Sequence, residues 1–456
     1  MAEIFPFRGI RYNPDRVDLS EVVTQPYDKI TPEMQEEYYR RSPYNYVRII
    51  LNKEPGERRY AEAERLLDLW LEEGILIRDE EPTLYAYHQE YQLEGGQRLT
   101  RKGFVALFKL SEYGKGILPH ERTLAKPKED RLKLIRATRA NLGQIFVLYS
   151  DPELKVNRLL DQAVSDSDLG SDSDSGSGRE PLSAVEPFDP TTVHRLWPIQ
   201  ARPVLEEIVE AMEDKTLFIA DGHHRYETAL AFCREMEASR EAECSCPNPE
   251  CYHNVMLTFV NMDDRGLTIF PTHRLIRELD EEGLEPAELE RKLTKYFGME
   301  RFDLTEQERL LRALQGGRTT GRHLFGLYLH GFANYYLLTL RDEGVMDELV
   351  PDRSPEWRRL DVTICHYLLL DKIFGIPPDG VEGRIDYKRS AEEALDLVKQ
   401  GKEAGAILLN PTTMEEVRKI AQNGERMPQK STDFYPKMLS GLVLNRFSQS
   451  VGSAPP

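Results

Sequence analysis

The sequence predicts an α/β protein with mixed sheets and more than one domain. Segments with helical apolar spacing alternate along the chain with short apolar runs typical of strands. Two segments of alternating apolar and polar residues flank Gly95-Gly96, as in a β-hairpin. The length of 456 residues exceeds what one ordinary core accommodates. We therefore expect an α/β or α+β architecture with two or three domains.

The expected elements follow one another in order. In the first half they are a helix that stops at Gly74, the hairpin, a helix over 130–139 and a buried strand over 143–150. Next come a helix over 202–214, a strand over 215–220, a helix from His223, and strand-like segments over 253–262 and 266–273. Beyond residue 300 we expect helices at QERLLRALQ, AEEALDLVKQG and TMEEVRKIAQ, and strands at HLFGLYLHG, ANYYLLTLRD and AGAILLN.

A segment from Asp161 to about Pro190 is rich in Ser, Asp and Gly and has few apolar residues to bury. It is expected to be a disordered acidic loop over 161–190. A domain boundary is the alternative, but we favour an insertion because motifs on its two sides look like parts of one site. The predicted regions are an N-terminal α/β region over 1–80, a core over 81–275 and a C-terminal α/β region over 276–456.

Composition limits the classes of function. Acidic residues outnumber basic ones by 78 to 60, and the net charge of −18 argues against broad nucleic-acid binding. No apolar stretch approaches the roughly 20 residues of a membrane helix. The N-terminus has no apolar segment of the signal-peptide kind. We expect a cytoplasmic protein with no membrane partner.

The stretch ADGHHR is the first candidate site. Asp221 should end a strand, and Gly222 permits a sharp turn or the close approach of a ligand. His223, His224 and Arg225 then fall in the first turn of a helix, where N–H groups and the helix dipole favour anions. Arg225 adds a guanidinium suited to phosphate. The alternative is that Asp221 is only an N-cap and the histidines make surface hydrogen bonds.

The stretch LPHERTLAKPKEDR is the second candidate. Glu121, beside His120, is a candidate general base that could take a proton from a substrate hydroxyl. Basic residues that follow, among them Arg131, could hold phosphate. A charged, solvent-exposed loop is the alternative.

Two secondary candidates lie further along the chain. Lys430, Ser431 and Thr432 could donate to an anion, as could Lys437, although they lack the glycine-rich lead of a P-loop and a plain turn fits the residues better. His273 and Arg274 follow a strand and could reach the same pocket, although a single strand-end histidine is more often structural.

The stretch CSCPNPECYH holds four potential zinc ligands. Cys244, Cys246, Cys251 and His253 suit a structural Zn²⁺ ion, but the spacing of the first pair is tighter than usual. Free thiols in a loop are the alternative.

The stretches TQPYDKI, ILPHERT, IADGHHRYETA, LTIFPTHR and MPQKSTDFYPK resemble the domain of unknown function 1015 family. The core is similar to the ParB/sulfiredoxin-like fold, and to free L-serine kinases that make O-phosphoserine. The resemblance implies ATP, ADP or pyrophosphate as donor, a serine-like acceptor and Mg²⁺. It implies that Glu121 activates the hydroxyl beside His120, that residues 222–225 bind phosphate, and that Asp221 contacts substrate or Mg²⁺.

Three other functions stay open, one of which is a zinc-stabilised interaction protein that only the cysteine cluster supports. Water could replace the acceptor, which would make the protein a phosphomonoester hydrolase acting on phosphoserine. Alternatively, the chain could be a non-catalytic, ParB-like nucleotide-binding module. The oligomeric state is open as well, with a homodimer as one arrangement.

Overall fold

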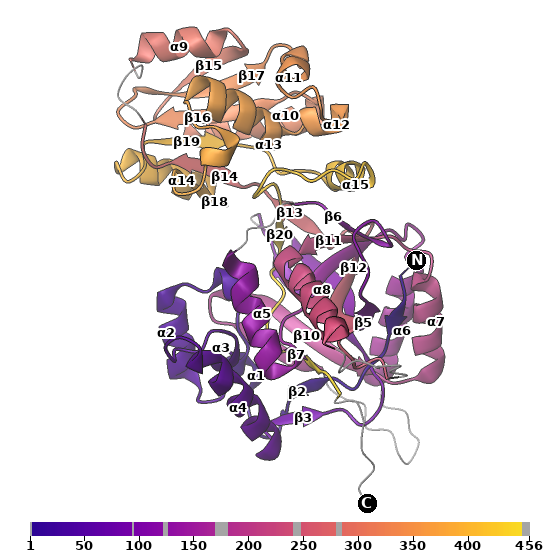
Figure 1. The fold of residues 1–456 in the computed structure, drawn as a ribbon. Coiled ribbons are helices and arrows are strands. Elements are labelled where there is room, and N and C mark those ends of the chain that lie inside the picture. Colours follow the sequence, from indigo (N-terminus) through magenta and orange to yellow (C-terminus); the bar gives the residue numbers. More distant parts are fainter. Residues whose placement is uncertain are drawn as a thin grey trace, which may run out of the picture. The chain divides into compact units, whose positions relative to one another are not determined.

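The computed structural model describes residues 2–93, 95–121, 126–168, 181–239, 248–279 and 285–448. Contacts divide the chain into two compact units (Figure 1). The first unit comprises Met1–Pro119, Thr123–Thr268 and Pro436–Pro456, and the second comprises His120–Arg122 and Ile269–Tyr435. The expected N-terminal region over 1–80 lies within the first unit. The division into three regions stays a prediction.

A nine-stranded mixed sheet organises the first unit. Its order is β6-β11-β8-β12-β5-β4-β10-β9, with β1 paired to β5. β11 runs parallel to β6 and antiparallel to β8, while β12 runs parallel to β8 and antiparallel to β5. The mixed sheet confirms the predicted class. The strands are β1 (Ile4–Phe5), β4 (Leu84–Gln92), β5 (Arg98–Lys109), β6 (Ile117–Pro119), β8 (Ile145–Tyr149), β9 (Leu182–Glu186), β10 (Asp189–Ile199), β11 (Leu217–Asp221) and β12 (Asn254–Asn261).

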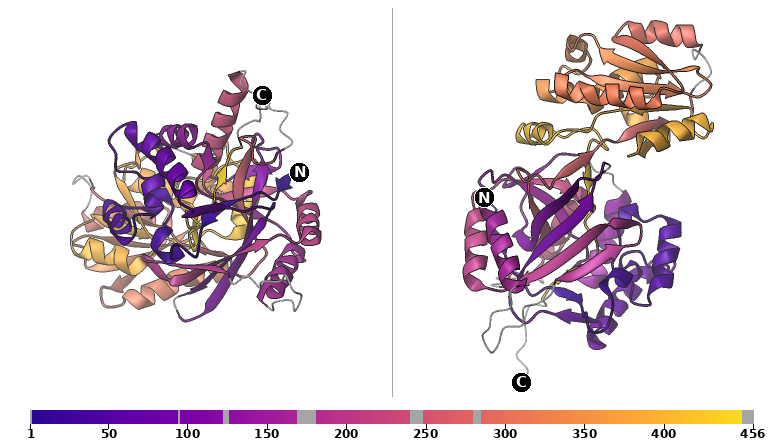
Figure 2. Two further views of the ribbon diagram at one scale, coloured as in Figure 1. Left: turned by 90° about the horizontal axis from the view of Figure 1, so that it is seen from below. Right: turned by 180° about the vertical axis from the view of Figure 1, so that it is seen from behind.

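Strand alternation and helical spacing build the core of this unit. Ile145, Val147 and Tyr149 of β8 all point into one buried cluster because side chains on a strand alternate between faces. Helix α7 (Arg202–Met212) begins with a proline in its first turn and contributes Leu205 to the same cluster. Figure 2 shows α7 beside α6 (Lys155–Asp168), in agreement with their contacts.

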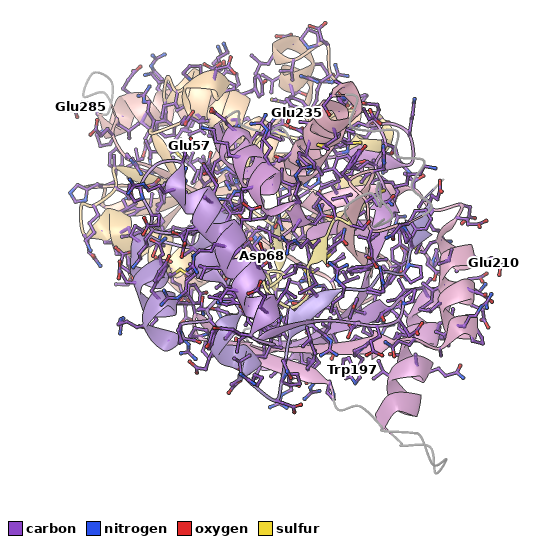
Figure 3. The ribbon with its side chains drawn as sticks, turned by 60° about the horizontal axis from the view of Figure 1, so that its bottom comes forward. Glu57, Asp68, Trp197, Glu210, Glu235 and Glu285 are labelled. Carbon is purple, nitrogen blue, oxygen red and sulfur yellow. The ribbon has the colours of Figure 1, made fainter. Side chains whose placement is uncertain are left out.

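Further helices complete the first unit: α1 (Leu19–Val22), α2 (Pro32–Arg41), α3 (Val47–Ile50), α4 (Arg58–Glu72), α5 (Lys126–Thr138) and α8 (His223–Ala238). Helix α5 contacts both α4 and α8. Ion pairs lie along these contacts: Lys133 binds Glu57 at 2.9 Å, and Arg136 Nε lies 2.9 Å from Glu235, which Figure 3 labels on α8. Short strands form two small sheets, β2 (Ile10–Tyr12) with β3 (Leu76–Arg78) and β7 (Ala140–Asn141) with β21 (Asn445–Arg446).

The predicted loop over 161–190 is wrong at both ends. Helix α6 continues to Asp168, and β9 and β10 begin at Leu182 and Asp189. Leu160 and Val164 are buried at i, i+4 spacing, so the start of the acidic segment has an apolar helical face that its composition hides. Residues 169–180 lie outside the described residues.

The second unit has a six-stranded sheet in the order β15-β17-β16-β19-β14-β18. Phe325, Leu327 and Leu329 of β16 enter one core cluster, while Leu324 and Tyr328 enter another on the opposite face. The strands are β14 (His273–Ile276), β15 (Phe297–Asp303), β16 (Leu324–Leu329), β17 (Asn334–Leu340), β18 (Ile385–Lys388) and β19 (Gly405–Leu408).

Helices cover the sheet of the second unit. They are α9 (Pro286–Thr294), α10 (Gln307–Thr320), α11 (Gly344–Leu349), α12 (Pro355–Arg358), α13 (Asp361–Ile364), the π-helical segment η2 (Cys365–Ile373), α14 (Ala391–Lys399) and α15 (Met414–Gln422). A capping box at Thr413 and Glu416 starts α15, as the sequence TMEE favours. Among the described residues, no helix is both long and apolar enough to cross a membrane.

Candidate functional site

The DGHHR turn has the backbone geometry of an anion site. β11 ends at Asp221, Gly222 adopts φ +92°, and α8 begins at His223. A residue with a side chain rarely adopts this φ, which explains the glycine. No side chain caps the helix, so Asp221 is not the N-cap. The first turn of a 16-residue helix therefore carries His223, His224 and Arg225, as predicted.

The Arg225 guanidinium is fixed beneath this turn. Nη1 donates to the Gln144 carbonyl, and Nη2 lies 3.3 Å from Asp221 Oδ2. Only 14% of the Arg225 side chain is exposed, against 32% for Asp221. A Cβ at position 222 would lie 3.0–3.1 Å from the guanidinium atoms. The missing side chain of Gly222 therefore lets the arginine lie against the turn.

Positive charge surrounds Asp221. Burial by itself would raise the pKa of this carboxyl, but Arg225, Lys437, Lys29 and His223 outweigh burial and lower the pKa to about 2. Asp221 is therefore ionised at neutral pH, and the four side chains that lower its pKa are all basic. Basic side chains gathered at the start of a helix favour an anionic ligand.

Lys29 was not among the predicted site residues, and Lys437 was predicted only as a further anion donor beside Lys430. Both lie in stretches that carry the family resemblance. Lys29 ends a short 3₁₀ helix over Tyr27–Lys29, far from residue 221 in the sequence. Tyr27 itself is covered by Arg131, whose Cζ lies 4.2 Å from the ring centre. Lys29 lies in the stretch TQPYDKI, which contributes to the family resemblance but for which the sequence predicts no role in the site.

Arg131 lies in the first unit beside Tyr27 and lines a cavity together with Arg225. Its Nε donates to Asp130 at 2.9 Å, and its Nη1 donates to the Ile50 carbonyl at 3.0 Å. A cavity of about 60 Å³ lies between Arg131 and Arg225, with Tyr27 and Thr228 also in its wall. Most of its remaining lining is apolar: Ile50, Leu134, Ile135, Ala140, Leu142, Ile145, Ala229 and Val255.

Comparison with known proteins identifies the family. This chain belongs to the family described as Protein of unknown function (DUF1015). The family model matches residues 4–363, which confirms the resemblance. None of the curated proteins matches this DUF1015 chain.

Three solved structures illustrate what the chain is similar to. A free serine kinase in complex with AMP is 14% identical, with 72% of this chain and 89% of that chain covered at a TM-score of 0.31. A conserved hypothetical protein from Pyrococcus furiosus is 12% identical (73% and 97% covered, TM-score 0.30). SbnI with a C-terminal truncation, from Staphylococcus aureus, is also 12% identical (73% and 85%, TM-score 0.30).

The second unit of this DUF1015 chain brings together most of the other predicted residues. Lys430 N–H donates to Glu121 Oε1 at 2.9 Å, and His120 Nε2 lies 2.9 Å from Thr432 Oγ1. Met427 N–H donates to the His120 carbonyl at 2.7 Å, so the two segments pair as a short parallel bridge. The turn around Lys430, itself at φ +57°, thus holds the Glu121 carboxylate. Glu121 is not a freely moving loop residue.

Arg274 contacts this turn from within the same unit. Its side chain is fully buried, Nη2 donates to the Lys430 carbonyl at 3.0 Å, and Nη1 donates to the Thr272 carbonyl. Burial lowers the Arg274 pKa, whereas Cys365, Tyr387 and then Glu121 raise it. Arg274 thus places a cation near the Glu121 carboxylate.

His273 and Ser431 have structural contacts. His273 Nδ1 accepts from Leu409 N–H at 3.1 Å, and burial followed by Arg274 lowers its pKa to about 3, so the ring is neutral. Ser431 Oγ donates to the Pro428 carbonyl at 2.6 Å. These contacts fit residues that shape the turn. Ligand binding by either one stays a prediction.

The predicted zinc ligands are only partly described. Cys244 and Cys246 lie outside the described residues. Cys251 and His253 are close to each other, with 3.6 Å between Sγ and Nδ1. The predicted four-ligand set therefore stays a prediction.

Proposed function

We propose that this DUF1015 chain is a phosphotransferase that moves a phosphoryl group from ATP, ADP or pyrophosphate to the hydroxyl of a small metabolite, with free serine as the acceptor. The observation that carries the proposal is the group of basic side chains around Asp221, at a helix whose N-cap is Gly222. Phosphate groups are the biological anions that such helix starts bind most readily.

The donor phosphates are assigned to the first unit. Backbone N–H groups of the first turn of α8 and the Arg225 guanidinium would hold phosphate oxygens. Lys29 and Lys437 would add positive charge as negative charge develops on the transferred group. Because Arg225 is already fixed by Gln144 and Asp221, little side-chain entropy is lost on binding.

Asp221 suits a magnesium ligand. Its carboxylate is ionised at neutral pH and partly exposed, and Mg²⁺ prefers one or two carboxylates together with phosphate oxygens. When bound, Mg²⁺ would neutralise charge on the donor phosphates. In that state Asp221 would divide its interaction between the ion and Arg225.

Glu121 is assigned the role of general base. A carboxylate held in place by Lys430 N–H keeps its second oxygen available for a substrate hydroxyl. His120 is a positioning residue: its bond to Thr432 and the pairing of its carbonyl with Met427 fix the backbone that carries Glu121. In the proposed step Glu121 would take the hydroxyl proton and the hydroxyl oxygen would form a bond to the donor phosphorus. The phosphorus–oxygen bond to the leaving group, which is ADP, AMP or orthophosphate for the three donors, would break.

Phosphorus NMR tests this function. Purified protein with serine, Mg²⁺ and either ATP, ADP or pyrophosphate should produce O-phosphoserine with at least one donor. Glu121→Gln should lower the rate by about 100-fold or more, since a general base contributes roughly that much. Glu415→Gln, an exposed site on α15 of the same unit, should leave the rate unchanged.

Other outcomes of this experiment separate the alternatives. No product with any donor, together with tight nucleotide binding, would indicate a nucleotide-binding module. Release of inorganic phosphate from phosphoserine without a donor would indicate a hydrolase. Equal product from wild type and Glu121→Gln would remove Glu121 from the mechanism.

A further inference from the structure

The C-terminal half of α8 carries two potential metal ligands on one face. Cys233 and Glu237 are four residues apart, so their side chains are neighbours on the helix. Cys233 Sγ lies 3.8 Å from Glu237 Oε1. Cys233 is buried, and burial followed by Glu237 raises the pKa of its thiol to about 12. Without another partner, the thiol stays protonated at neutral pH.

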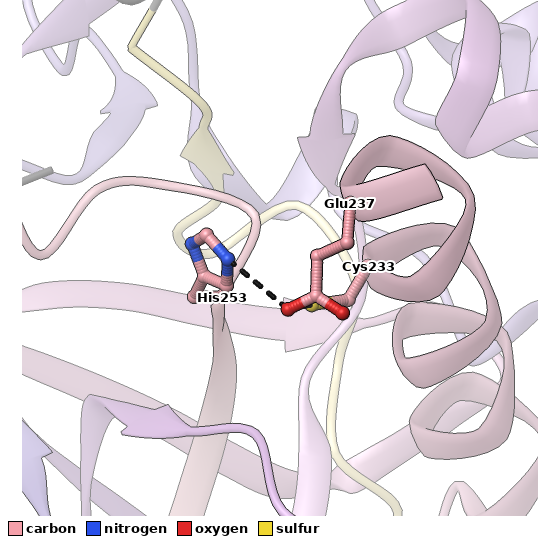
Figure 4. A group of neighbouring side chains, drawn as sticks. All are labelled: Cys233, Glu237 and His253. Atoms are coloured by element: carbon pink, nitrogen blue, oxygen red, sulfur yellow. Dashed lines mark hydrogen bonds and ion pairs between the residues drawn. The ribbon is translucent and has the colours of Figure 1, made fainter. Parts of the chain in front are cut away.

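His253 supplies a third ligand from another segment. It lies directly before β12, and its Nε2 is 3.4 Å from Glu237 Oε1. Figure 4 shows the three side chains converging, with the imidazole and the carboxylate facing each other. One potential ligand atom from each of Cys233, Glu237 and His253 lies within 4.8 Å of the other two.

Two of the three separations are close to the edges of a tetrahedral zinc site, and the third, between Cys233 and His253, is no more than 4.8 Å. With Zn–S near 2.3 Å and Zn–N or Zn–O near 2.0 Å, tetrahedral angles place ligand atoms about 3.3–3.5 Å apart. The observed separations of 3.4 Å and 3.8 Å need shifts of only a few tenths of an ångström. Thiolate, imidazole and carboxylate are all ordinary zinc ligands.

Cys251 provides the outer contact that such a histidine requires. Its Sγ lies 3.6 Å from His253 Nδ1, the ring nitrogen away from Glu237. Asn254 Nδ2 lies 3.8 Å from the same sulfur, which fixes it in place. A metal-bound histidine usually donates its second ring N–H to a carboxylate, a backbone carbonyl or water, which sets the ring orientation, and here the Cys251 sulfur takes that place. The Tyr252 ring lies beside the imidazole, with ring centres 4.4 Å apart.

We infer that Cys233, Glu237 and His253 bind one Zn²⁺ ion, with Cys251 orienting the histidine. Binding exchanges the thiol proton of Cys233 for a Zn–S bond and releases that proton to solvent. The ion would tie the C-terminal half of α8 to the segment that leads into β12. This ligand set differs from the one that the sequence predicts, and it does not depend on the proposed phosphotransfer.

Metal analysis of the purified full-length chain tests the site. The wild type should carry about one zinc per chain, and the chelator-treated protein should bind Co²⁺ with the intense visible absorption of a tetrahedral, thiolate-bound ion. Cys233→Ser, Glu237→Gln and His253→Ala should each weaken Co²⁺ binding by about 100-fold or more, and Cys251→Ser by about 10-fold. Glu235→Gln, on the same helix but paired with Arg136, should bind as the wild type does.

Three results would overturn the inference. One is a wild type that has no zinc and fails to bind Co²⁺. Another is a Cys233→Ser variant that binds Co²⁺ as tightly as the wild type. The third is that Cys244→Ser and Cys246→Ser lose Co²⁺ binding while Cys233→Ser keeps it. That result would assign the ion to the ligand set predicted from the sequence. Circular dichroism of each variant separates loss of metal from loss of fold.

Discussion

Asp221 shows how single residues determine the charge of the candidate site. Burial alone would favour the neutral acid, but four neighbours that carry or can carry positive charge keep it ionised, with a pKa of about 2. The same carboxylate fixes Arg225 at 3.3 Å. One residue therefore orients the guanidinium and lies among basic side chains that suit phosphate.

Asp221→Asn should destabilise the first unit in a pH-dependent way. Because the folded-state pKa is lower than that of an unfolded aspartate, ionised Asp221 stabilises the fold above about pH 4. That contribution disappears as pH falls from about 4 to about 2. At pH 7 the variant should lose about 1–2 kcal/mol of unfolding free energy.

Urea unfolding of wild type and Asp221→Asn at pH 7, 5 and 3.5 would measure this difference. The gap between the two proteins should be similar at the upper two values and smaller at the lowest. A gap that does not change with pH would mean that the charge of Asp221 does not stabilise the fold.

At the level of residues, the sequence identifies site residues that are contiguous and misses neighbours that come from remote segments of the chain. Asp221 to Arg225 are contiguous, so their placement at a strand end and a helix start could be predicted. Lys29 and Lys437 lower the Asp221 pKa although they lie in remote segments of the chain. The spacing of apolar residues does not indicate which remote segments lie beside Asp221. The same holds for Cys233 and His253, whose proximity depends on how α8 packs against the start of β12.

At the level of elements, Gly222 joins β11 to α8 with a positive φ, and a substitution there tests whether the turn holds Arg225 in place. Gly222→Ala should lose about 1–2 kcal/mol of stability from strain at positive φ. It should also bind ADP about 10-fold more weakly, because its Cβ would lie 3.0–3.1 Å from the Arg225 guanidinium and displace it.

Gly74→Ala is the matched control. Gly74 also has positive φ, at +70°, but a Cβ there would meet nothing within 4 Å. It should lose about 1 kcal/mol of stability and keep its affinity for ADP. Thermal unfolding and calorimetric titration of both variants compare the effects. Equal ADP affinity in the two variants would exclude a role for Gly222 in placing Arg225.

Elements with a clear period could be predicted, and those with mixed composition could not. The hairpin, α7, β11 and α8 follow from alternation, helical spacing and glycine stops. Helix α6 was not predicted at all, and its part from Asp161 onward was assigned to a loop because serine and aspartate obscure its apolar face. The π-helical segment η2 has no recognised sequence signal, since its apolar residues fit an ordinary buried helix equally well.

At the level of the whole molecule, the contacts assign His120–Arg122 to the second unit and the residues on both sides of it to the first. Sequence continuity would place this segment with its flanks. Its hydrogen bonds to Met427, Lys430 and Thr432, about 300 residues away, decide otherwise. Such long-range pairing is what a single sequence does not reveal.

The two units should therefore make separable contributions. Arg225→Ala, in the first unit, should impair donor binding, whereas Glu121→Gln, in the second, should impair transfer and leave donor binding intact. Arg234→Ala is the matched control for the first variant, because Arg234 lies on α8 and pairs with the exposed Glu112.

Calorimetric titration of ADP with Mg²⁺ into these proteins tests the central claim, that the turn before α8 binds the donor phosphates. Arg225→Ala should bind ADP about 10- to 100-fold more weakly than the wild type, since a hydrogen bond to a charged group contributes about 1.5–3 kcal/mol. Glu121→Gln and Arg234→Ala should bind within about twofold of the wild type. An Arg225→Ala variant that is folded and binds ADP as tightly as Arg234→Ala would contradict the assignment.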